Sequence, residues 1–128
     1  MRVLLDTHLM VWAALAHPRL GATATAALND PTADVWFSVV SIWEAAIKHA
    51  KHPQSFPIPP DVLRDSALAA DWSELPVTGA HAVATMGLPD IHGDPFDRML
   101  VAQARAEGMV LLSADRTLLR YGDPVRPG

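Results

Sequence analysis

Four carboxylic acids in this sequence stand where a catalytic site could be assembled. Each follows an apolar run that predicts a buried strand, or lies in the first turns of a helix next to such a run. In open α/β sheets, ligands bind outside the carboxyl ends of the strands, so these side chains could meet at one end of a sheet. The four acids are Asp6, Glu44, Asp97 and Asp115.

Carboxylates that are brought together repel one another and raise each other's pKa. A hard divalent cation removes this repulsion, and both Mg²⁺ and Mn²⁺ prefer oxygen ligands. Such a site activates water and stabilises an in-line displacement at phosphorus. The pattern therefore predicts metal-dependent hydrolysis of a phosphodiester or a phosphomonoester.

Helix capping is the alternative role for each acid taken alone. Asp6 and Asp115 each precede a predicted helix and could cap it. Ser41 and Glu44 have the spacing of a capping box, and Glu44 could also form a solvated ion pair with Lys48. Capping is the favoured interpretation of any one of these acids, so the chemical hypothesis depends on the four together.

Asp97 is the acid that capping explains least well. Asp94 and Pro95 predict the start of a helix, and the helix dipole favours an acid in its first turn. At about 100° per residue, however, Asp97 falls on the apolar face of that helix, opposite Arg98. A carboxylate there is costly unless it is paired or binds a metal. The apolar face comprises Leu100, Val101 and Ala104.

The composition limits what kind of protein carries this site. Of the 128 residues, 50% are apolar, which suits one domain over residues 1–128 and excludes disorder as the dominant state. The absence of cysteine excludes disulfides, thiolate metal sites and thiol nucleophiles. The longest apolar run, residues 9–16, is shorter than the roughly 20 residues of a membrane span. We therefore expect a soluble, cytoplasmic protein with no membrane partner.

Strands and helices are predicted to alternate along the chain. The alternation predicts an α/β fold with a mainly parallel sheet that helices cover on both faces. Short apolar runs predict strands at residues 3–5, 35–37, 74–77 and 109–112. Apolar spacing and helix start and stop signals predict helices at residues 6–16, 22–29, 41–51, 61–70, 79–86, 95–107 and 115–120.

Four segments carry a resemblance to a known family. The sequence resembles PIN-domain ribonucleases, specifically the VapC-type toxins of bacterial type II toxin–antitoxin systems. The resemblance covers nearly the whole chain, in the family's order, and its third segment is the most specific. The segments are residues 4–8 (LLDTH), 38–44 (SVVSIWE), 92–104 (HGDPFDRMLVAQA) and 111–115 (LLSAD).

The resemblance implies a fold, a cofactor and a set of site residues. The fold would be a small α/β/α sandwich with a parallel five-stranded sheet, its last strand a weak one near Pro124 and Val125. The cofactor would be Mg²⁺ or Mn²⁺. Ser113, where the family more often has threonine, would orient a metal ligand or a water molecule. The implied metal ligands are Asp6, Glu44, Asp97 and Asp115.

The resemblance also implies an activity and partners. Family members are endoribonucleases in which water activated by the metal attacks the scissile phosphate of RNA in line. They form homodimers and are inhibited by a cognate antitoxin of the VapB type. Arg98 and Arg116 directly follow site acids and could touch phosphate, although solvent-facing salt bridges are the favoured interpretation. His92 could contact substrate or merely close its loop.

Two rival functions have weaker support. A PIN-fold binding module would act through its antitoxin and RNA interface with little turnover, but the chain has all four acids. A phosphatase or phosphoacceptor domain also places aspartates at strand ends. However, His8 stands where dehalogenase-type phosphatases have a second aspartate, and the only lysines, Lys48 and Lys51, lie in one early predicted helix.

The net charge of −4 at first argues against nucleic acid as a partner, because phosphate binding normally requires a basic surface. Removing the four proposed ligands from the 14 acids leaves 10, against 10 Lys and Arg. The acidity is therefore that of the proposed metal site, and two bound Mg²⁺ ions would cancel it. RNA is disfavoured only while that site is empty.

Overall fold

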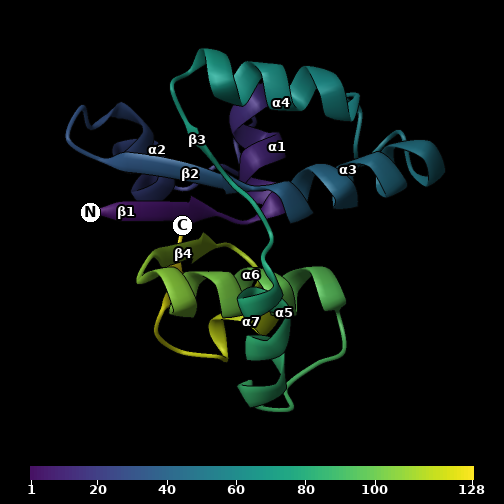
Figure 1. Cartoon of the computed structure of the whole chain (residues 1–128). Coiled ribbons are helices and arrows are strands. Elements are labelled where there is room, and N and C mark those ends of the chain that lie inside the picture. Colours follow the sequence, from purple (N-terminus) through teal and green to yellow (C-terminus); the bar gives the residue numbers. More distant parts are fainter.

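A computed structural model describes the whole chain, from Met1 to Gly128. Five strands form one sheet in the order β3-β2-β1-β4-β5, and every neighbouring pair is parallel (Figure 1). The predicted α/β fold with a five-stranded parallel sheet is thus confirmed, including its weak last strand. The strands are β1 (Arg2–Leu5), β2 (Asp34–Ser38), β3 (Ser73–Leu75), β4 (Val110–Ser113) and β5 (Val125–Pro127).

Seven α-helices and one short 3-10 turn connect the strands. They are α1 (Thr7–Leu15), α2 (Ala22–Asn29), α3 (Val39–Lys51), α4 (Pro60–Ala69), α5 (Gly79–Ala84), η1 (Thr85–Gly87), α6 (Pro95–Glu107) and α7 (Arg116–Leu119). Gly108 ends α6 with a φ of 64°, a left-handed conformation that favours glycine. None of the helices is long and apolar enough to cross a membrane.

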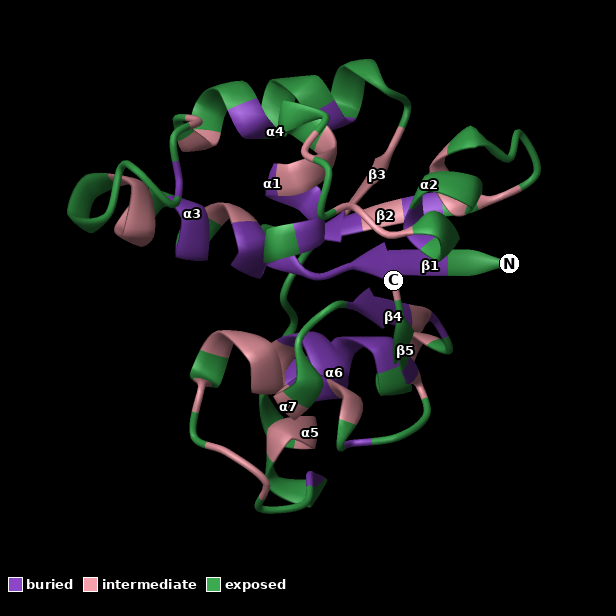
Figure 2. Cartoon of the chain, turned by 180° about the vertical axis from the view of Figure 1, so that it is seen from behind, coloured by how far each residue is buried: buried purple, intermediate pink, exposed green.

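Side chains on β1 alternate between two faces of the sheet, and a different set of helices covers each face. Leu4 packs with Leu100 of α6, whereas Val3 and Leu5 pack against α1 and α2. A further apolar cluster around Phe37 lies among α1, α3 and α4. Figure 2 shows the central strands β1, β2 and β4 largely buried between these layers, with the outer faces of the helices exposed. The chain is therefore an α/β/α sandwich, as predicted.

The strand order determines where a binding site can form. From β1, the sheet extends through β2 and β3 on one side and through β4 and β5 on the other. In open parallel sheets, ligands bind where the order reverses, outside the carboxyl ends of the two central strands. Leu5 of β1 pairs with Leu112 of β4, so the next residues, Asp6 and Ser113, come side by side at this point.

The start of α3 differs from the prediction. The helix was predicted from Ser41, but it begins at Val39, and Ser38 is its N-cap. The Ser38 hydroxyl accepts a hydrogen bond from the N–H of Val40 at 3.0 Å. Ser41 and Glu44 therefore do not form a capping box. The β-branched pair Val39 and Val40 extends the strand pattern of β2 in the sequence, which conceals the first turn of the helix.

Candidate active site

Asp6 lies at the junction of β1 and α1. Its carboxylate accepts a hydrogen bond from the N–H of Leu9 at 2.9 Å, so it caps α1, as the capping hypothesis allowed. Its own N–H donates to the carbonyl of Leu112 at 3.1 Å and extends the pairing of β1 with β4. Only 3% of the residue is exposed. Capping therefore fixes the position of this acid, and burial shields it from water.

The environment of Asp6 disfavours its charged form. Burial raises the pKa of this carboxyl group to about 6, and the charges of Asp115 and Glu44 act in the same direction. Hydrogen bonds from the Ser113 hydroxyl and the Leu9 N–H lower the pKa but do not compensate for burial. A simple cap on a helix end has no such cost, because it remains in contact with water. The position of Asp6 thus carries an energetic cost that capping alone does not explain.

Ser113 and Asp115 form the second part of the site, at the end of β4. The buried Ser113 hydroxyl bonds the Asp6 carboxylate and accepts a hydrogen bond from the N–H of Asp115 at 3.0 Å. Asp115 is exposed and caps α7, accepting from the N–H of Thr117 at 2.7 Å. Ser113 therefore links the two acids. Arg116 is exposed and forms no ion pair, so the predicted salt bridge at this residue is absent.

Glu44 is buried on α3, with 2% of its side chain exposed. It pairs with Lys48 one turn later, so the ion pair anticipated from the sequence forms, but the carboxylate is not solvated. The second carboxylate oxygen, Oε1, is buried and has no hydrogen-bond partner. A buried acceptor without a partner is costly. This atom is therefore available to a cation.

Asp97 lies in the first turn of α6 and is partly buried, as its place on the apolar face predicted. Its carboxylate bonds His92 Nε2 at 3.1 Å, and its N–H donates to the capping carboxylate of Asp94 at 3.0 Å. Burial raises the pKa of Asp97 to about 6, although the His92 hydrogen bond lowers it. The charges of Asp94, Glu44 and Asp115 raise it further.

His92 and Arg98 hold the loop before α6 against the site. His92 Nδ1 bonds the Tyr121 hydroxyl at 2.9 Å while its Nε2 bonds Asp97, so His92 closes its loop. Arg98 donates to the same hydroxyl at 3.1 Å and to the Pro89 carbonyl at 2.9 Å. The predicted solvent-facing salt bridge of Arg98 is therefore wrong. The loop folds back over the start of α6 and supplies carbonyl acceptors that the helical wheel could not show.

The four acids share one electrostatic environment without forming a closed cluster. The pKa values of Asp6 and Asp97 are both raised by Glu44 and Asp115, which come from different elements. Yet no three acidic or histidine side chains are arranged as a group that would hold a metal ion. Lys48, His92 and helix N–H groups hold the carboxylates individually.

The donor set nevertheless fits a hard divalent cation. All four candidate ligands offer carboxylate oxygens, which Mg²⁺ and Mn²⁺ prefer. Burial has left Glu44 Oε1 without a partner and has raised the pKa of Asp6 and Asp97. A bound cation would satisfy the orphaned oxygen and favour the ionised carboxylates. The candidate ligands are Asp6, Glu44, Asp97 and Asp115.

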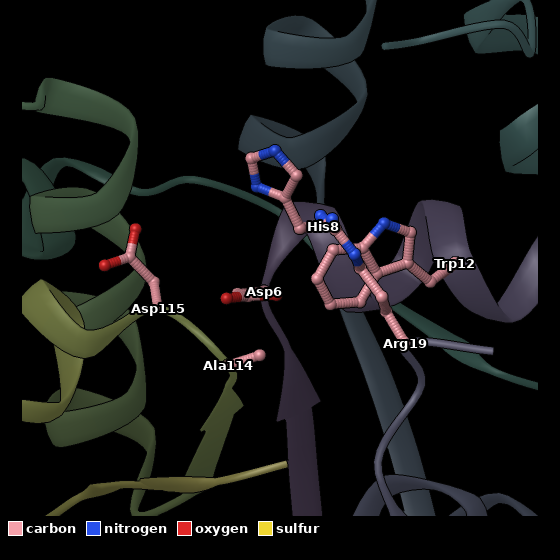
Figure 3. A pocket seen from close by; sticks show the side chains of 6 residues that line it. All are labelled: Asp6, His8, Trp12, Arg19, Ala114 and Asp115. Carbon is pink, nitrogen blue, oxygen red and sulfur yellow. The ribbon is translucent and has the colours of Figure 1, made fainter. Parts of the chain in front are cut away.

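A pocket beside Asp6 and Asp115 contains residues that the sequence did not single out. Figure 3 shows the two acids at the ends of neighbouring strands, with His8, Trp12 and Arg19 on the other side of the pocket. Trp12 is partly buried and packs against the apolar cluster around Val3 and Leu5. The available signal was the spacing of four between His8 and Trp12, which places both on one face of a helix.

Comparison with solved structures finds the same fold in several complexes. VapBC2 from Rickettsia felis, bound to a DNA fragment from its promoter, is 15% identical with a TM-score of 0.73, covering 100% of this chain and 98% of that one. A toxin–antitoxin complex from Klebsiella pneumoniae is 15% identical with a TM-score of 0.62, covering 97% and 95%. FitAcB from Neisseria gonorrhoeae is 16% identical with a TM-score of 0.66, covering 98% and 96%.

Sequence comparison gives the family. No curated protein matches the chain with significant sequence similarity. The PIN domain family matches residues 3–124, which include all four candidate acids and Ser113. The resemblance seen in the sequence motifs is thereby confirmed at the level of the family. This chain belongs to the PIN domain family.

Proposed function

We propose that this protein is a metal-dependent endoribonuclease, the toxin of a bacterial type II toxin–antitoxin module of the VapBC kind. The observation that carries the proposal is the pair of carboxyl groups, Asp6 and Asp97, whose pKa values burial raises to about 6. A fold has no structural need for two such acids near a third, Glu44, that is also buried. Perturbed acids at the switch point of an α/β sheet favour a functional site.

The proposed mechanism assigns a role to each residue of the site. Asp6, Glu44, Asp97 and Asp115 would hold Mg²⁺ or Mn²⁺. When bound, the cation supplies the positive charge that activates water and stabilises the negative charge on the phosphate oxygens. Ser113 positions two of the carboxylates, because its hydroxyl bonds Asp6 and the N–H of Asp115. No side chain is required as a nucleophile.

The surroundings of the acids would keep them in place between turnovers. Lys48 compensates the charge of Glu44, and His92 holds the carboxylate of Asp97. The Lys48 charge neutralises a buried acid, and the hydrogen bond from His92 favours the ionised form of Asp97, while no cation is bound. Cation binding would then compete with Lys48 and His92 rather than with bulk water alone.

The proposed partners follow from the complexes that share this fold. One of them is described as a toxin–antitoxin complex, and another is VapBC2 bound to promoter DNA. We accordingly propose a cognate VapB-type antitoxin as an inhibitory partner, a homodimer as the assembly, and the cytoplasm as the place of action on RNA.

The function is tested with purified chain that is free of antitoxin. Incubation with total RNA and Mg²⁺ or Mn²⁺ should give discrete cleavage products, which 5′-end sequencing would map, and excess EDTA should stop the reaction. Cleavage that persists in EDTA would contradict the metal mechanism. Absence of cleavage with either metal, from protein that still binds an antitoxin, would favour the binding module instead.

A further inference from the structure

A groove leads away from Asp6 and Asp115 along one face of α1. The pocket next to the acids, of about 240 Å³, is lined on its far side by His8, Trp12 and Arg19. A second pocket, of about 280 Å³, is lined by the same three residues and continues to the loop after α3. The two pockets therefore form one groove, with these three residues at its centre.

The local structure explains why these side chains lie together. His8 and Trp12 are four residues apart on α1, and their ring centroids are 5.9 Å apart. Ala16, with a φ of 50°, ends α1 and turns the chain back. His17 then stacks on Trp12 at 5.8 Å and accepts a hydrogen bond from the N–H of Arg19 at 3.0 Å. The turn thus packs on Trp12 and places Arg19 in the groove.

The charge of Arg19 is uncompensated within the chain. The residue is exposed, takes part in none of the five ion pairs and donates no side-chain hydrogen bond. By contrast, Arg64 and Arg126 pair with acids, and Arg98 is bonded to carbonyl oxygens. The Arg19 guanidinium therefore faces the groove with its donors free (Figure 3).

We propose that this groove binds single-stranded RNA next to the bond that is cut. Arg19 would bind a backbone phosphate, and the rings of His8 and Trp12 would stack a neighbouring base. The inference rests on the proposed ribonuclease function and adds a subsite to it. Guanidinium groups bind phosphate with paired hydrogen bonds, and aromatic rings stack unpaired bases of any sequence.

The combination of groups favours RNA over a protein segment as the occupant. A single strand presents phosphates and flat bases in alternation, and the groove offers a cation beside two aromatic rings. The groove also opens directly onto Asp6 and Asp115, so a strand lying in it would reach the candidate metal ligands. An apolar protein segment would offer no anion or hydrogen-bond acceptor to the free guanidinium of Arg19.

Binding of a labelled oligonucleotide tests the proposal. The probe is a fluorescein-labelled, random-sequence 12-nucleotide single-stranded RNA, and its anisotropy is measured with the full chain in Ca²⁺, a cation that binds oxygen ligands and compensates the charge of the acids. Gel electrophoresis of the probe after each titration checks that it is still intact. Arg19→Ala should weaken binding about tenfold at low salt, since it removes a charge-assisted contact. It should also make the salt dependence shallower by about 0.7 in log–log slope, the value for one phosphate on a single strand.

Two further variants separate phosphate binding from stacking. His8→Ala should weaken binding by about fivefold or more while leaving the salt dependence unchanged, because stacking involves no counterion release. Arg105→Ala is the matched control. Arg105 is also exposed and unpaired, but it lies in the last turn of α6 beside the start of β4, at the opposite end of the sheet from the acids. This control should bind as wild type does.

The outcomes distinguish this inference from the proposed function. If Arg19→Ala and Arg105→Ala both bind RNA as wild type does, or if wild type binds no RNA, the RNA subsite is wrong even if the protein cuts RNA with Mg²⁺. In the first case, a protein segment would be the remaining candidate for the occupant of the groove. If Arg19→Ala selectively loses RNA binding but wild type cuts no RNA with either metal, the subsite stands and the nuclease function fails.

Discussion

At the scale of single residues, the site is defined by buried carboxyl groups that the fold accommodates at a cost. Asp6 shows this most clearly, because burial outweighs its hydrogen bonds to Ser113 and Leu9 and leaves its pKa at about 6. Glu44 shows the same conflict in another form, with one oxygen paired to Lys48 and the other without a partner. Residues whose burial carries such an energetic cost are expected to serve function rather than stability.

The first prediction concerns the charge of Asp6. Asp6→Asn removes the buried charge and keeps the helix cap, because asparagine caps as well as aspartate. In EDTA at pH 7 the variant should be more stable than wild type by about 2–3 kcal/mol, the free energy that corresponds to the raised pKa. Urea unfolding measures the change. Asp6→Ala, which also loses the cap, should gain about 1 kcal/mol less, and a loss of stability in Asp6→Asn would contradict the account.

The second prediction concerns pH. The pKa values of Asp6 and Asp97 are raised in the native state, so between about pH 4 and pH 6 the folded chain binds more protons than the unfolded chain. These two groups therefore make the unfolding free energy fall as pH rises through that interval. In EDTA, the difference in stability between Asp6→Asn and wild type should be near zero at pH 4 and reach its full value by pH 7. A difference that does not vary with pH would show that the Asp6 charge is not the cause.

At the scale of elements, β1, β4 and α6 position the site. The pairing of β1 with β4 brings Asp6 beside Ser113. Asp97 is positioned by α6. Asp94 caps the start of this helix, Gly108 ends it, and the buried Gln103 connects it to the rest of the fold. The Gln103 side chain accepts from the Ser38 hydroxyl at 2.5 Å and so fixes α6 relative to β2.

The third prediction tests the start of α6. Asp94→Ala should destabilise the protein by about 1 kcal/mol, because the Asp97 N–H loses its capping acceptor. Asp94→Asn should keep the cap and most of the stability. Thermal unfolding of the two variants makes the comparison, and equal melting temperatures would show that the cap contributes nothing.

Sequence patterns were sufficient for the elements but not for the contacts between them. Val3–Leu5 and the Asp94–Pro95 signal predicted β1 and α6 because these signals are local. The partners of Arg98 could not be predicted, since its carbonyl acceptors lie in a loop whose path depends on tertiary packing. Burial of Glu44 was missed for a similar reason: its spacing to Lys48 predicts the ion pair but does not show which elements cover the carboxylate.

At the scale of the whole molecule, one site accounts for the net charge of −4, because the remaining acidic and basic residues balance. The sheet order reverses at β1 and β4, so the topology concentrates this charge at one end of the fold. A protein built in this way should be stabilised by the cation it is proposed to use, since binding favours the native state.

The fourth prediction measures that stabilisation. Mg²⁺ at about ten times its dissociation constant should raise the unfolding free energy by about 1.4 kcal/mol and the melting temperature by roughly 4–7 °C at pH 7.5. The shift should shrink at pH 5.5, where protons compete for Asp6 and Asp97, whose pKa values are about 6. Na⁺ at equal ionic strength is the control, and an equal shift with Na⁺ would indicate only general screening.

The central claim is that the carboxylates of this site act together in cutting RNA. It is tested most directly by the rate of Mg²⁺-dependent RNA cleavage by Asp97→Asn, compared with Asp90→Asn, an exposed aspartate of the loop before α6. Both variants lose one negative charge, but only Asp97 is a proposed metal ligand. The account predicts that Asp97→Asn loses at least about 100-fold in rate, the cost of removing one strong electrostatic contribution, while Asp90→Asn cuts as wild type does. Cleavage by Asp97→Asn at the wild-type rate would contradict it.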